Sequence, residues 1–350
     1  MARVKAARPL ELFDRAEWAA LTRVSPWRGA WLVAHCWGGI ALAIGLALWV
    51  WDAAGPLAGA PAVLAAIVIV GGRQLGLAIL MHDAAHGLLS RDRGRNNRMG
   101  EWLAGAPVGS DLKAYRAYHL THHRYTQQDE DPDLELSSPF PTSRASLHRK
   151  ILRDLTGRTF LKTRGSQLVM GWRALKAQLE ALLRKQEPRA DAARRDPGLL
   201  PLQERANGSR GEVRSFAGAA MLRFLGVNAL LLIVPWALGA GPWPFLIWLA
   251  ALATTFQLFL RVRNIAEHAC TATGSDDPFT HARTTHANWL ERATVAPYWV
   301  NYHSEHHLFM AVPCYRLPQA HRALVAKGHA SRMTIAPGYA EVLRMAAGAA

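Results

Sequence analysis

The sequence predicts an all-α integral membrane protein, with four transmembrane helices in two hairpins and a cytosolic helical cap that carries three clusters of histidines. Half of its 350 residues are hydrophobic. Two long runs are almost free of charge: residues 29–72 contain one charged residue, Asp52, and residues 224–260 contain none. A membrane span needs roughly 20 apolar residues, so each run is long enough to cross twice. This pattern excludes an ordinary soluble enzyme.

Turn-forming residues divide each apolar run into two spans. We expect the first run to reverse at residues 52–56, giving one span at 30–51 and another that begins near Pro61. The second run is expected to reverse at 239–242, between spans at 219–239 and 243–261. The predicted regions are an N-terminal segment at 1–28, a first hairpin with a histidine cluster at 29–90, a cap at 91–217, a second hairpin at 218–268 and a C-terminal cap at 269–350.

The distribution of charge predicts the orientation. The chain has a net charge of +15, and residues 91–214 contain 24 Lys and Arg against 15 Asp and Glu. The positive-inside rule then puts this segment and both termini in the cytoplasm. Arg outnumbers Lys 34 to 7, which is typical of GC-rich bacterial genomes, so we expect the inner membrane of a bacterium. The first 28 residues lack the pattern of a signal peptide.

The three cysteines have no metal-binding or disulfide spacing. If the topology is right, Cys270 and Cys314 should be reachable from the cytosol, while Cys36 should be shielded within the first span.

The middle of the cap contains an amphipathic segment at 165–185. Its apolar residues fall on one helical face: Leu168, Trp172, Leu175, Leu179 and Leu182. Such a helix either lies in the membrane interface or packs on the rest of the cap. Residues 186–214 are rich in Arg, Pro and Gly, which predicts a solvated linker.

Eight of the fifteen histidines form the three clusters. The clusters are His82 and His86; His119, His122 and His123; and His303, His306 and His307. Spacings of three and four residues put side chains on one face of a helix, so each cluster can direct its imidazoles at one point. His82 and His86 lie just past the second predicted span, and the other two clusters lie in predicted cytosolic segments. A shared site just outside the bilayer is therefore possible.

A further pair lies at the end of the fourth span. Asn264 and His268 are four residues apart and follow Arg261 and Arg263, which mark the exit from the membrane. An ordinary polar helix end would look the same. Because the other histidines are expected at the same depth, we predict His268 as a metal ligand and Asn264 as a ligand or as a residue that holds water.

Nine imidazoles are too many for one catalytic zinc, which uses about three protein ligands. Imidazole suits iron, copper, nickel and zinc alike, so the ligands alone do not identify the metal. Two ions, each with four or five imidazoles and an open position, account for the number.

The clusters resemble the histidine boxes of the membrane-bound fatty acid desaturase and hydroxylase superfamily. The resemblance covers roughly residues 60–325 and rests on His82-Asp83-Ala84-Ala85-His86, on His119-Leu120-Thr121-His122-His123 and on His303-Ser304-Glu305-His306-His307. The pair Asn264 and His268 is similar to the extra ligands of acyl-CoA desaturases. The resemblance implies a diiron centre with O₂ as co-substrate, a role in lipid metabolism, and desaturation of a fatty acyl chain.

The same resemblance leaves the outcome open between a desaturase and a hydroxylase or ketolase that acts on a lipid or carotenoid. A remote alternative is a membrane protein that binds metal without redox chemistry, such as a metal carrier or hydrolase. Carrier ligands should lie near the middle of the membrane, whereas these lie at the ends of the spans.

Several further residues lie near the boxes or the spans, and their positions predict different roles. Carboxylates often accept the second N–H of a metal-bound imidazole, so Asp83, Glu267, Glu305 and Asp131 are candidates for that contact. His35 is expected to be a hydrogen-bonded packing residue, and His281 and His286 lack the box spacing. His148, His321 and His329 are expected at the surface. We interpret the tryptophans at the span edges as interfacial anchors: Trp27, Trp31, Trp49, Trp51, Trp243 and Trp248.

The sequence contains no glycine-rich dinucleotide motif, no cysteine cluster for an iron–sulfur site and no His-Pro-Gly-Gly haem signature. Electrons are therefore expected from another protein, such as a ferredoxin or cytochrome b5. The positive charge suits an acidic carrier or anionic lipid head groups, and we expect no nucleic acid partner.

Overall fold

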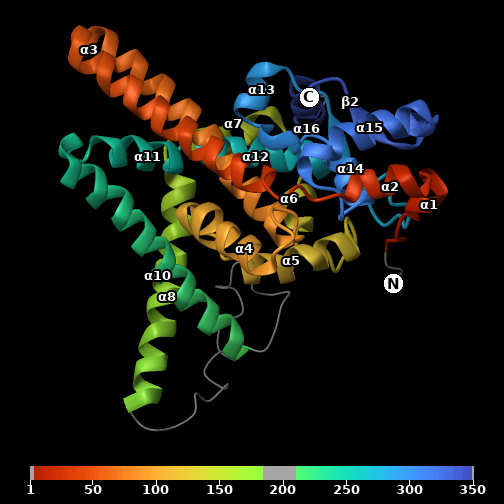
Figure 1. The fold of residues 1–350 in the computed structure, drawn as a ribbon, viewed down its shortest axis with the longest axis horizontal. Helices are drawn as coiled ribbons and strands as arrows, with labels where there is room; N and C mark the ends of the chain where they lie inside the picture. The colour runs from red at the N-terminus through yellow and green to blue at the C-terminus, as the bar shows by residue number, and fades with distance from the viewer. Residues whose placement is uncertain (1–3, 184–209, 349–350) are drawn as a thin grey trace.

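The computed structural model describes residues 4–183 and 210–348, and almost all of its regular structure is helical (Figure 1). The helices before the gap are α1 (Pro9–Leu12), α2 (Arg15–Thr22), α3 (Arg28–Ala85), α4 (Arg93–Arg98), η1 (Met99–Gly105), η2 (Ala106–Val108), α5 (Leu112–Tyr125), α6 (Leu134–Ser137), α7 (Arg144–Leu155) and α8 (Arg158–Leu183). The helices after it are α10 (Arg210–Pro235), η5 (Trp236–Ala240), α11 (Trp243–Ala253), α12 (Thr255–His268), α13 (Trp289–Ala293), η6 (Pro297–Trp299), α14 (His303–Leu308), η7 (Cys314–Arg316), α15 (Leu317–Ala326), η8 (His329–Arg332) and α16 (Tyr339–Ala346).

Two short strands interrupt the predicted all-α fold. β1 (Arg283–Thr285) pairs in parallel with β2 (Thr334–Ala336), and Thr284 also bridges to Tyr302. Three residues are too few to show the alternation that marks a strand in a sequence, so the expectation of helices alone missed this sheet.

α3 doubles back on itself at Gly55. The backbone of Gly55 has φ +73°, a region that favours glycine, and it lies inside the turn predicted at 52–56. Beyond it the two arms run side by side: a Cβ on Gly59 would come 2.8 Å from the Cα of Trp51, and the Cys36 thiol donates to the carbonyl of Arg73 at 3.1 Å.

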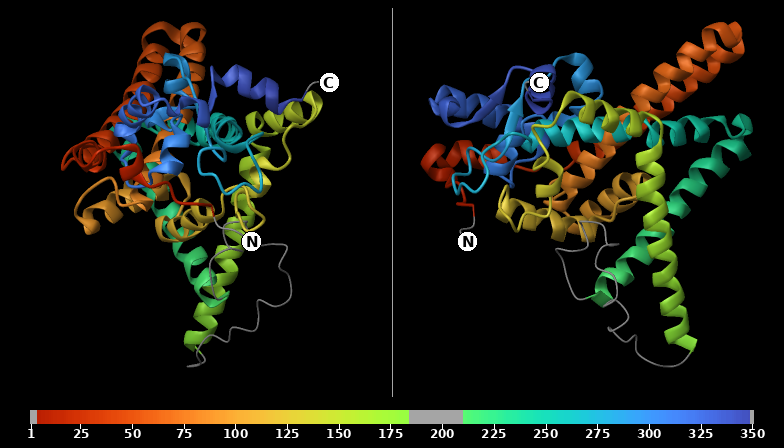
Figure 2. Two further views of the ribbon diagram at one scale, coloured as in Figure 1. Left: turned by 90° about the vertical axis from the view of Figure 1, so that its right-hand side faces the viewer. Right: turned by 180° about the vertical axis from the view of Figure 1, so that it is seen from behind.

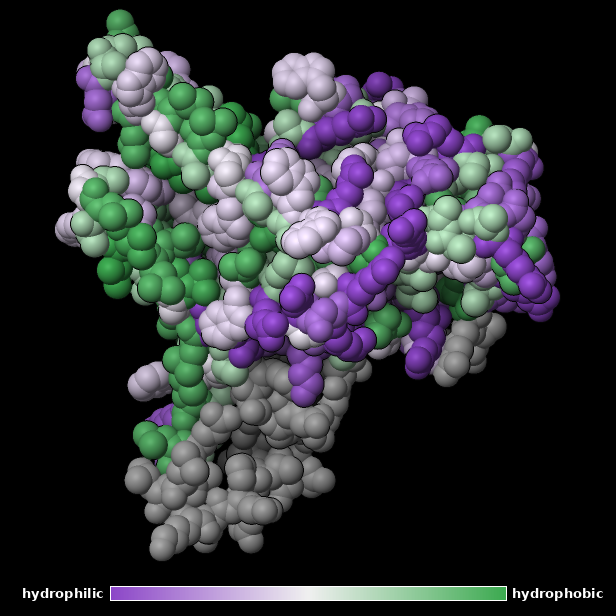
Figure 3. Space-filling view, in the orientation of Figure 1, coloured by the Kyte–Doolittle hydropathy of each residue, from purple (hydrophilic) through white to green (hydrophobic). Residues whose placement is uncertain are grey.

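Within residues 4–183 and 210–348, three helices are long and apolar enough to cross a membrane: Arg28–Ala85, which includes both arms of α3, Gly218–Ala240 and Trp243–His268. The tip of α3 and the turn between α10 and α11 point to the same side of the molecule in Figures 1 and 2, away from the C-terminal elements. Figure 3 shows hydrophobic residues gathered over the same helices, while most of the hydrophilic residues on this face lie toward the C-terminal elements.

The predicted fourth span at 243–261 is not one straight helix. α11 ends at Ala253, and Thr254 adopts φ −121° and ψ −84° before α12 begins. The hydroxyls of Thr254 and Thr255 donate to main-chain carbonyls of Ala250 and Ile67, at 2.6 and 2.8 Å. Such side-chain bonds to the backbone commonly bend helices.

Trp248, which we expected at the membrane interface, lies in the interior. Its ring stacks on Trp37 with centroids 5.5 Å apart, and its indole N–H donates to Asn228 at 2.9 Å. Trp248 packs among α3, α10 and α11 and so is not an interfacial anchor. The other predicted anchors are exposed: Trp27, Trp31, Trp49, Trp51 and Trp243.

The amphipathic segment at 165–185 lies mostly within α8 and packs on α10. A Cβ on Gly218 would come 3.3 Å from Leu175, whereas Trp172 and Leu179 are exposed. One side of the predicted apolar face thus contacts α10 and another remains open. Of the predicted linker at 186–214, the last residues belong to α10, and 186–209 lie outside the described residues.

Candidate metal centre

α12 and the second arm of α3 bring two ligand pairs to one level. They approach closely where a Cβ on Gly71 would lie 2.1 Å from the Thr255 hydroxyl oxygen. From this crossing His82 is 11 residues along α3 and His268 is 13 residues along α12. At about 1.5 Å per residue these distances are roughly 16 and 20 Å. The two helices therefore deliver their histidines to the same region.

α5 is fixed against the end of α3. The guanidinium of Arg116 donates to the carbonyls of Ala85 and Ala84 at 2.8 and 3.0 Å. Carbonyls in the last turn of a helix lack the regular partner four residues further on, and that of Ala84 also accepts from the Gly87 N–H at 3.0 Å and the Asn96 amide at 2.9 Å. The arginine therefore joins the helix of the second box to the end of the first box.

The third box is held by the small sheet. The amide nitrogen of Asn301 donates to the Thr285 carbonyl at 2.9 Å, and the Thr284 hydroxyl donates to Glu305. Glu305 also accepts from His321. The predicted surface position of His321 is wrong, since its imidazole packs on this buried carboxylate.

The structure brings all nine predicted histidines together in two groups. Ligand atoms within each group lie within 4.8 Å of one another. One group contains five histidines, His82, His86, His119, His123 and His306, and the other contains four, His122, His268, His303 and His307. The first box contributes to the five-histidine group alone, whereas the second and third boxes contribute to both groups. His268 belongs to the four-histidine group.

In the four-histidine group an oxygen atom lies near every Nδ1. The Nδ1 of His122 donates to Asp131 at 2.7 Å, and that of His268 donates to the His281 carbonyl at 3.0 Å. The Nδ1 of His303 lies 3.4 Å from Glu267, and that of His307 lies 3.3 Å from the Thr126 hydroxyl oxygen. A proton on each Nδ1 leaves a lone pair on each Nε2.

These Nε2 atoms face one another. His303 and His268 have their Nε2 atoms 2.9 Å apart, His307 and His303 3.1 Å, and His122 and His307 3.3 Å. Ligands at right angles around an ion with bonds of about 2.1 Å stand about 3.0 Å apart. Facing lone pairs repel unless a cation lies between them, so this group fits a metal ion.

The five-histidine group converges in the same way. The Nε2 of His123 lies 2.9 Å from that of His119 and 3.0 Å from that of His306. The buried Nε2 atoms of His82 and His86 have no hydrogen-bond partner among the described residues. Unpaired buried polar atoms are rare, and metal ligation would satisfy both.

Burial keeps most of these imidazoles neutral, as ligands must be. It lowers the pKa of His86 to about 4, and it holds the pKa of His119, His123 and His306 well below the ordinary imidazole value. His122 differs: burial alone would lower its pKa, but the carboxylate of Asp131 raises it.

The candidate carboxylates have different partners. Asp131 and Glu267 contact imidazoles of the four-histidine group, as expected. Asp83 instead accepts from the backbone N–H of Cys314 at 3.1 Å, and Glu305 contacts Thr284 and His321. Neighbouring helices, which the sequence does not specify, turn these two carboxylates away from the boxes.

Asn264 lies on the wall of a cavity of about 20 Å³ beside the four-histidine group. Its amide oxygen accepts from Arg263 at 3.1 Å, and a second lone pair on that oxygen is left over. Tyr115 and His268 line the same cavity, which has room for about one water molecule.

Other side chains of the centre carried no signal in the sequence. Gln127 donates to the carbonyl of His268 at 2.7 Å and so joins the second box to α12. His281 was expected to have no part in the site, and its imidazole indeed binds the carbonyl of Ser275 at 2.7 Å. Its own backbone carbonyl nevertheless orients His268, a contribution that any residue type could make.

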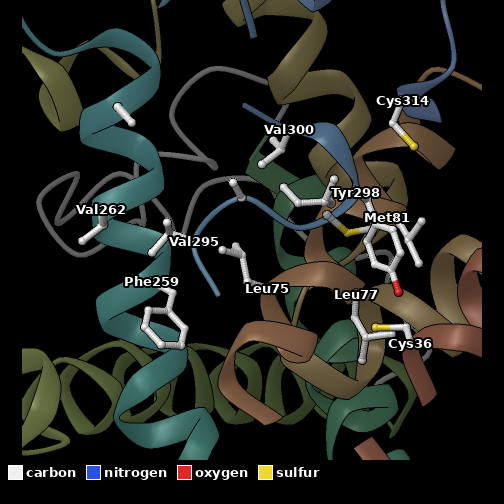
Figure 4. Close-up of a cluster of buried hydrophobic side chains, with 14 of the residues drawn as sticks. Cys36, Leu75, Leu77, Met81, Phe259, Val262, Val295, Tyr298, Val300 and Cys314 are labelled. Carbon is white, nitrogen blue, oxygen red and sulfur yellow. The ribbon is translucent and has the colours of Figure 1, made fainter. Parts of the chain in front are cut away.

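An apolar cluster lies beside the centre, between α3 and α12 (Figure 4). It includes Leu75, Met81, Phe259, Val262 and Val300. These side chains belong to the buried hydrophobic core of the described residues.

Comparison with known proteins identifies the family and several relatives of the chain. A model of the fatty acid desaturase family matches residues 57–339. Dihydrorhizobitoxine desaturase from Bradyrhizobium elkanii is 25% identical over 279 residues, which are 79% of this chain and 69% of that protein. A β-carotene ketolase from Paracoccus sp. strain PC1 is 34% identical over 112 residues, which are 31% of this chain and 40% of the ketolase. A second Paracoccus β-carotene ketolase, from strain N81106, matches at 34% over 113 residues.

Proposed function

Because the chain belongs to the fatty acid desaturase family, we propose that it is a membrane-bound diiron oxidoreductase that uses O₂ to introduce a double bond into a lipid acyl chain. The observation that carries the proposal is the convergence of nine imidazole nitrogens into groups of five and four. Neither a single catalytic zinc nor a transport site explains that number.

The metal ligands we propose are the nine histidines of the two groups: His82, His86, His119, His123 and His306 for one ion, and His122, His268, His303 and His307 for the other. Asn264 is proposed to hold a water molecule in the small cavity beside His268. Two irons would supply the redox chemistry that O₂ activation requires.

The electrons of the reaction must balance. Removing two hydrogens from neighbouring CH₂ groups supplies two electrons and two protons. Reduction of O₂ to two waters takes four of each, so an external donor must provide the other two electrons and the solvent the remaining protons. We propose a ferredoxin or cytochrome b5 as donor, attracted by the net charge of +15.

The chain's own residues orient the ligands. Asp131 and the carbonyl of His281 accept from the Nδ1 of His122 and His268, which directs the Nε2 atoms of these imidazoles inward. Glu267 lies within ion-pair distance of the Nδ1 of His303.

For the topology we propose two membrane hairpins, the two arms of α3 and the pair formed by α10 with α11–α12. Both hairpin tips would reach the far side of a bacterial inner membrane. Both termini and the histidine centre would lie in the cytoplasm, as the excess of basic residues between 91 and 214 supports.

A hydroxylase or ketolase is the second candidate. The matches to two β-carotene ketolases favour it, although each covers 31% of this chain. The same ligands could serve either outcome, because the product depends on how the substrate is held.

Product analysis separates these functions. The full chain would be expressed in a bacterial host, its lipids analysed by mass spectrometry, and its iron counted after anaerobic purification. We expect about two irons per chain and products that have lost two hydrogens. His303→Ala, as the control, should give neither. Products with an added oxygen would indicate the hydroxylase or ketolase, and full activity with one bound zinc would contradict the diiron proposal.

A further inference from the structure

A second cavity lies apart from the histidine centre, where the first arm of α3 meets η6. Its volume is about 690 Å³, within the range of small-molecule binding sites. Arg28, His35 and Arg73 from α3 line it, together with Arg292 and Tyr298 from the segment before the third box. The histidine ligands take no part in it.

The cavity carries positive charge without a compensating acid. Three arginines and no Asp or Glu line it. The arginines in ion pairs among the described residues are others: Arg8, Arg223, Arg261, Arg263 and Arg344. Guanidinium groups match carboxylates and phosphates with paired hydrogen bonds, so an oxyanion is the ligand this charge favours.

The arginines are held in place by neutral partners. The Nη2 of Arg73 donates to the Ala293 carbonyl at 3.0 Å, and its guanidinium lies 5.6 Å from the ring centroid of Tyr298. The guanidinium of Arg28 lies 5.1 Å from the ring centroid of Tyr315. These contacts fix the positions of the charges but do not neutralise them.

The other walls of the cavity are apolar and lie at the N-terminal end of α3. Trp27 and Trp31, 77% and 64% exposed, line the cavity at the start of a helix long enough to span a bilayer. Tryptophan prefers the boundary between head groups and acyl chains. An anionic ligand with an alkyl tail would therefore find both of its parts matched here.

The wall contributed by η6 has an unusual backbone. Tyr298 and Trp299 have φ +52° and +59°, although neither is glycine. Residues other than glycine adopt this region rarely, and such a conformation persists only where the surroundings hold it. Here the Tyr298 hydroxyl donates to the Leu32 carbonyl at 3.2 Å and also contacts His35 at 3.1 Å.

We propose that this cavity binds the oxyanion head group of a membrane amphiphile, either a carboxylate or a phosphate, with its alkyl tail along the exposed tryptophans of α3. Binding is independent of the chemistry at the histidine centre and requires no iron. η6 ends four residues before His303, so an occupant would contact the segment that leads into the third box.

The test measures binding to the full chain, purified in detergent. One probe is tritiated palmitate, another is tritiated phosphatidylglycerol, and the uncharged comparison is tritiated methyl palmitate. We expect saturable binding of at least one anionic probe and none of the ester. Palmitate alone would identify a carboxylate ligand, phosphatidylglycerol alone a phosphate, and both a general oxyanion site.

The double variant Arg28→Gln/Arg292→Gln removes two exposed charges and should weaken binding by about tenfold or more, because a charge-assisted hydrogen bond contributes about 1.5–3 kcal/mol. Arg73→Gln should act in the same direction. Arg173→Gln, an exposed charge on α8, is the matched control and should bind as the parent chain does. Equal binding by the double variant and the control, equal binding of the ester, or no saturable binding would overturn the proposal.

These outcomes are separate from the proposed enzyme function. A chain that binds the anionic probe but forms no desaturated product would support this site and contradict the desaturase. Iron content and thermal stability of each variant, measured alongside, would identify any variant that is simply misfolded.

Discussion

The imidazoles of the two histidine groups differ in what touches their outer nitrogen. In the four-histidine group, Asp131 and Glu267 contact His122 and His303. Among the described residues, no acid lies within ion-pair distance of the five-histidine group. A carboxylate on the outer N–H makes an imidazole a more basic ligand, so the four-histidine group should hold its ion more tightly than its lower ligand count suggests.

Asp131→Asn tests this difference. The amide keeps the shape but removes the negative charge, so affinity for one of two irons should fall by about 10–100-fold. Iron per chain after dialysis against a chelator should then drop from about two toward one. Asp129→Asn, an exposed neighbour, should retain the parent content. Equal iron in both variants would show that Asp131 does not tune the site.

His268 and His281 offer a second comparison, because they touch each other yet have different proposed roles. His268→Ala removes a proposed ligand and should lose iron and turnover together. His281→Ala keeps the backbone carbonyl that orients His268, so it should retain iron while a buried cavity lowers the free energy of unfolding by about 1–3 kcal/mol. Metal analysis and thermal denaturation measure the two effects separately. Iron loss in His281→Ala with His268→Ala unaffected would require a different ninth ligand.

Among single residues, sequence spacing predicted those that share one helix. The pairs at three and four residues gave all eight box histidines, and the helix end at Arg263 gave His268. His321 and Thr284 could not be found, because their roles depend on Glu305 being turned toward them by the fold. Contacts between elements leave no periodic trace in a sequence.

At the scale of elements, α3 comes close to its neighbours at glycine residues, because glycine has no side chain. A Cβ on Gly72 would lie 2.3 Å from the carbonyl oxygen of Ala293 and 2.9 Å from the Cα of Thr294. Real atoms do not come so close, and both neighbours belong to the backbone. Gly72 therefore sets the distance between α3 and the segment that leads to the third box.

Gly72→Ala should push that segment away and destabilise the protein by about 1–3 kcal/mol, as overpacking does. Gly38→Ala in the other arm of α3 meets open space and should be neutral or stabilising by up to about 1 kcal/mol, because alanine favours a helix. Thermal denaturation in detergent compares the two. If both variants melted alike, the close packing at Gly72 would not be a source of stability.

The elements were predictable to different degrees. The sequence Asp-Ala-Ala-Gly-Pro predicted the reversal at Gly55. α11 begins directly after the turn predicted at 239–242. The break at Thr254 was not foreseen, since it arises from threonine hydroxyls that bind main-chain carbonyls, one of them on another helix. The sheet of β1 and β2 pairs segments about 50 residues apart and is equally invisible locally.

At the scale of the whole molecule, the cysteines test how the chain lies in the membrane. Cys270 is exposed, whereas Cys36 and Cys314 are buried. The expectation that Cys314 is accessible is therefore wrong: it lies against Asp83, and burial raises the pKa of its thiol, so little reactive thiolate forms.

An impermeant maleimide should thus label Cys270 alone, and only from the cytoplasmic side. Inside-out vesicles should react, intact spheroplasts should not, and Cys270→Ser should abolish the signal. Denaturant should then expose all three thiols as an internal standard. Labelling of Cys270 from outside the cell would reverse the proposed orientation.

The overall architecture follows from two quantities that a sequence does contain, the length of its apolar runs and the placement of its charges. Those quantities gave the helical class and the positions of both reversals. They do not specify how α8 lies on α10 or how the arginine-lined cavity forms, because both depend on side chains from distant segments.

The distribution of ligands along the chain has a consequence for biogenesis. Both groups include histidines of the third box, His306 in one and His303 with His307 in the other. During synthesis, the five-histidine group cannot be complete until residue 306 has left the ribosome, nor the four-histidine group until residue 307 has, and by then both hairpins have had the opportunity to insert. Iron would therefore be acquired as a late step, and it would close chain loops of up to 224 residues, from His82 to His306. A ribosome that stalls before the third box would release a membrane-inserted chain with no complete metal site, which limits premature redox chemistry.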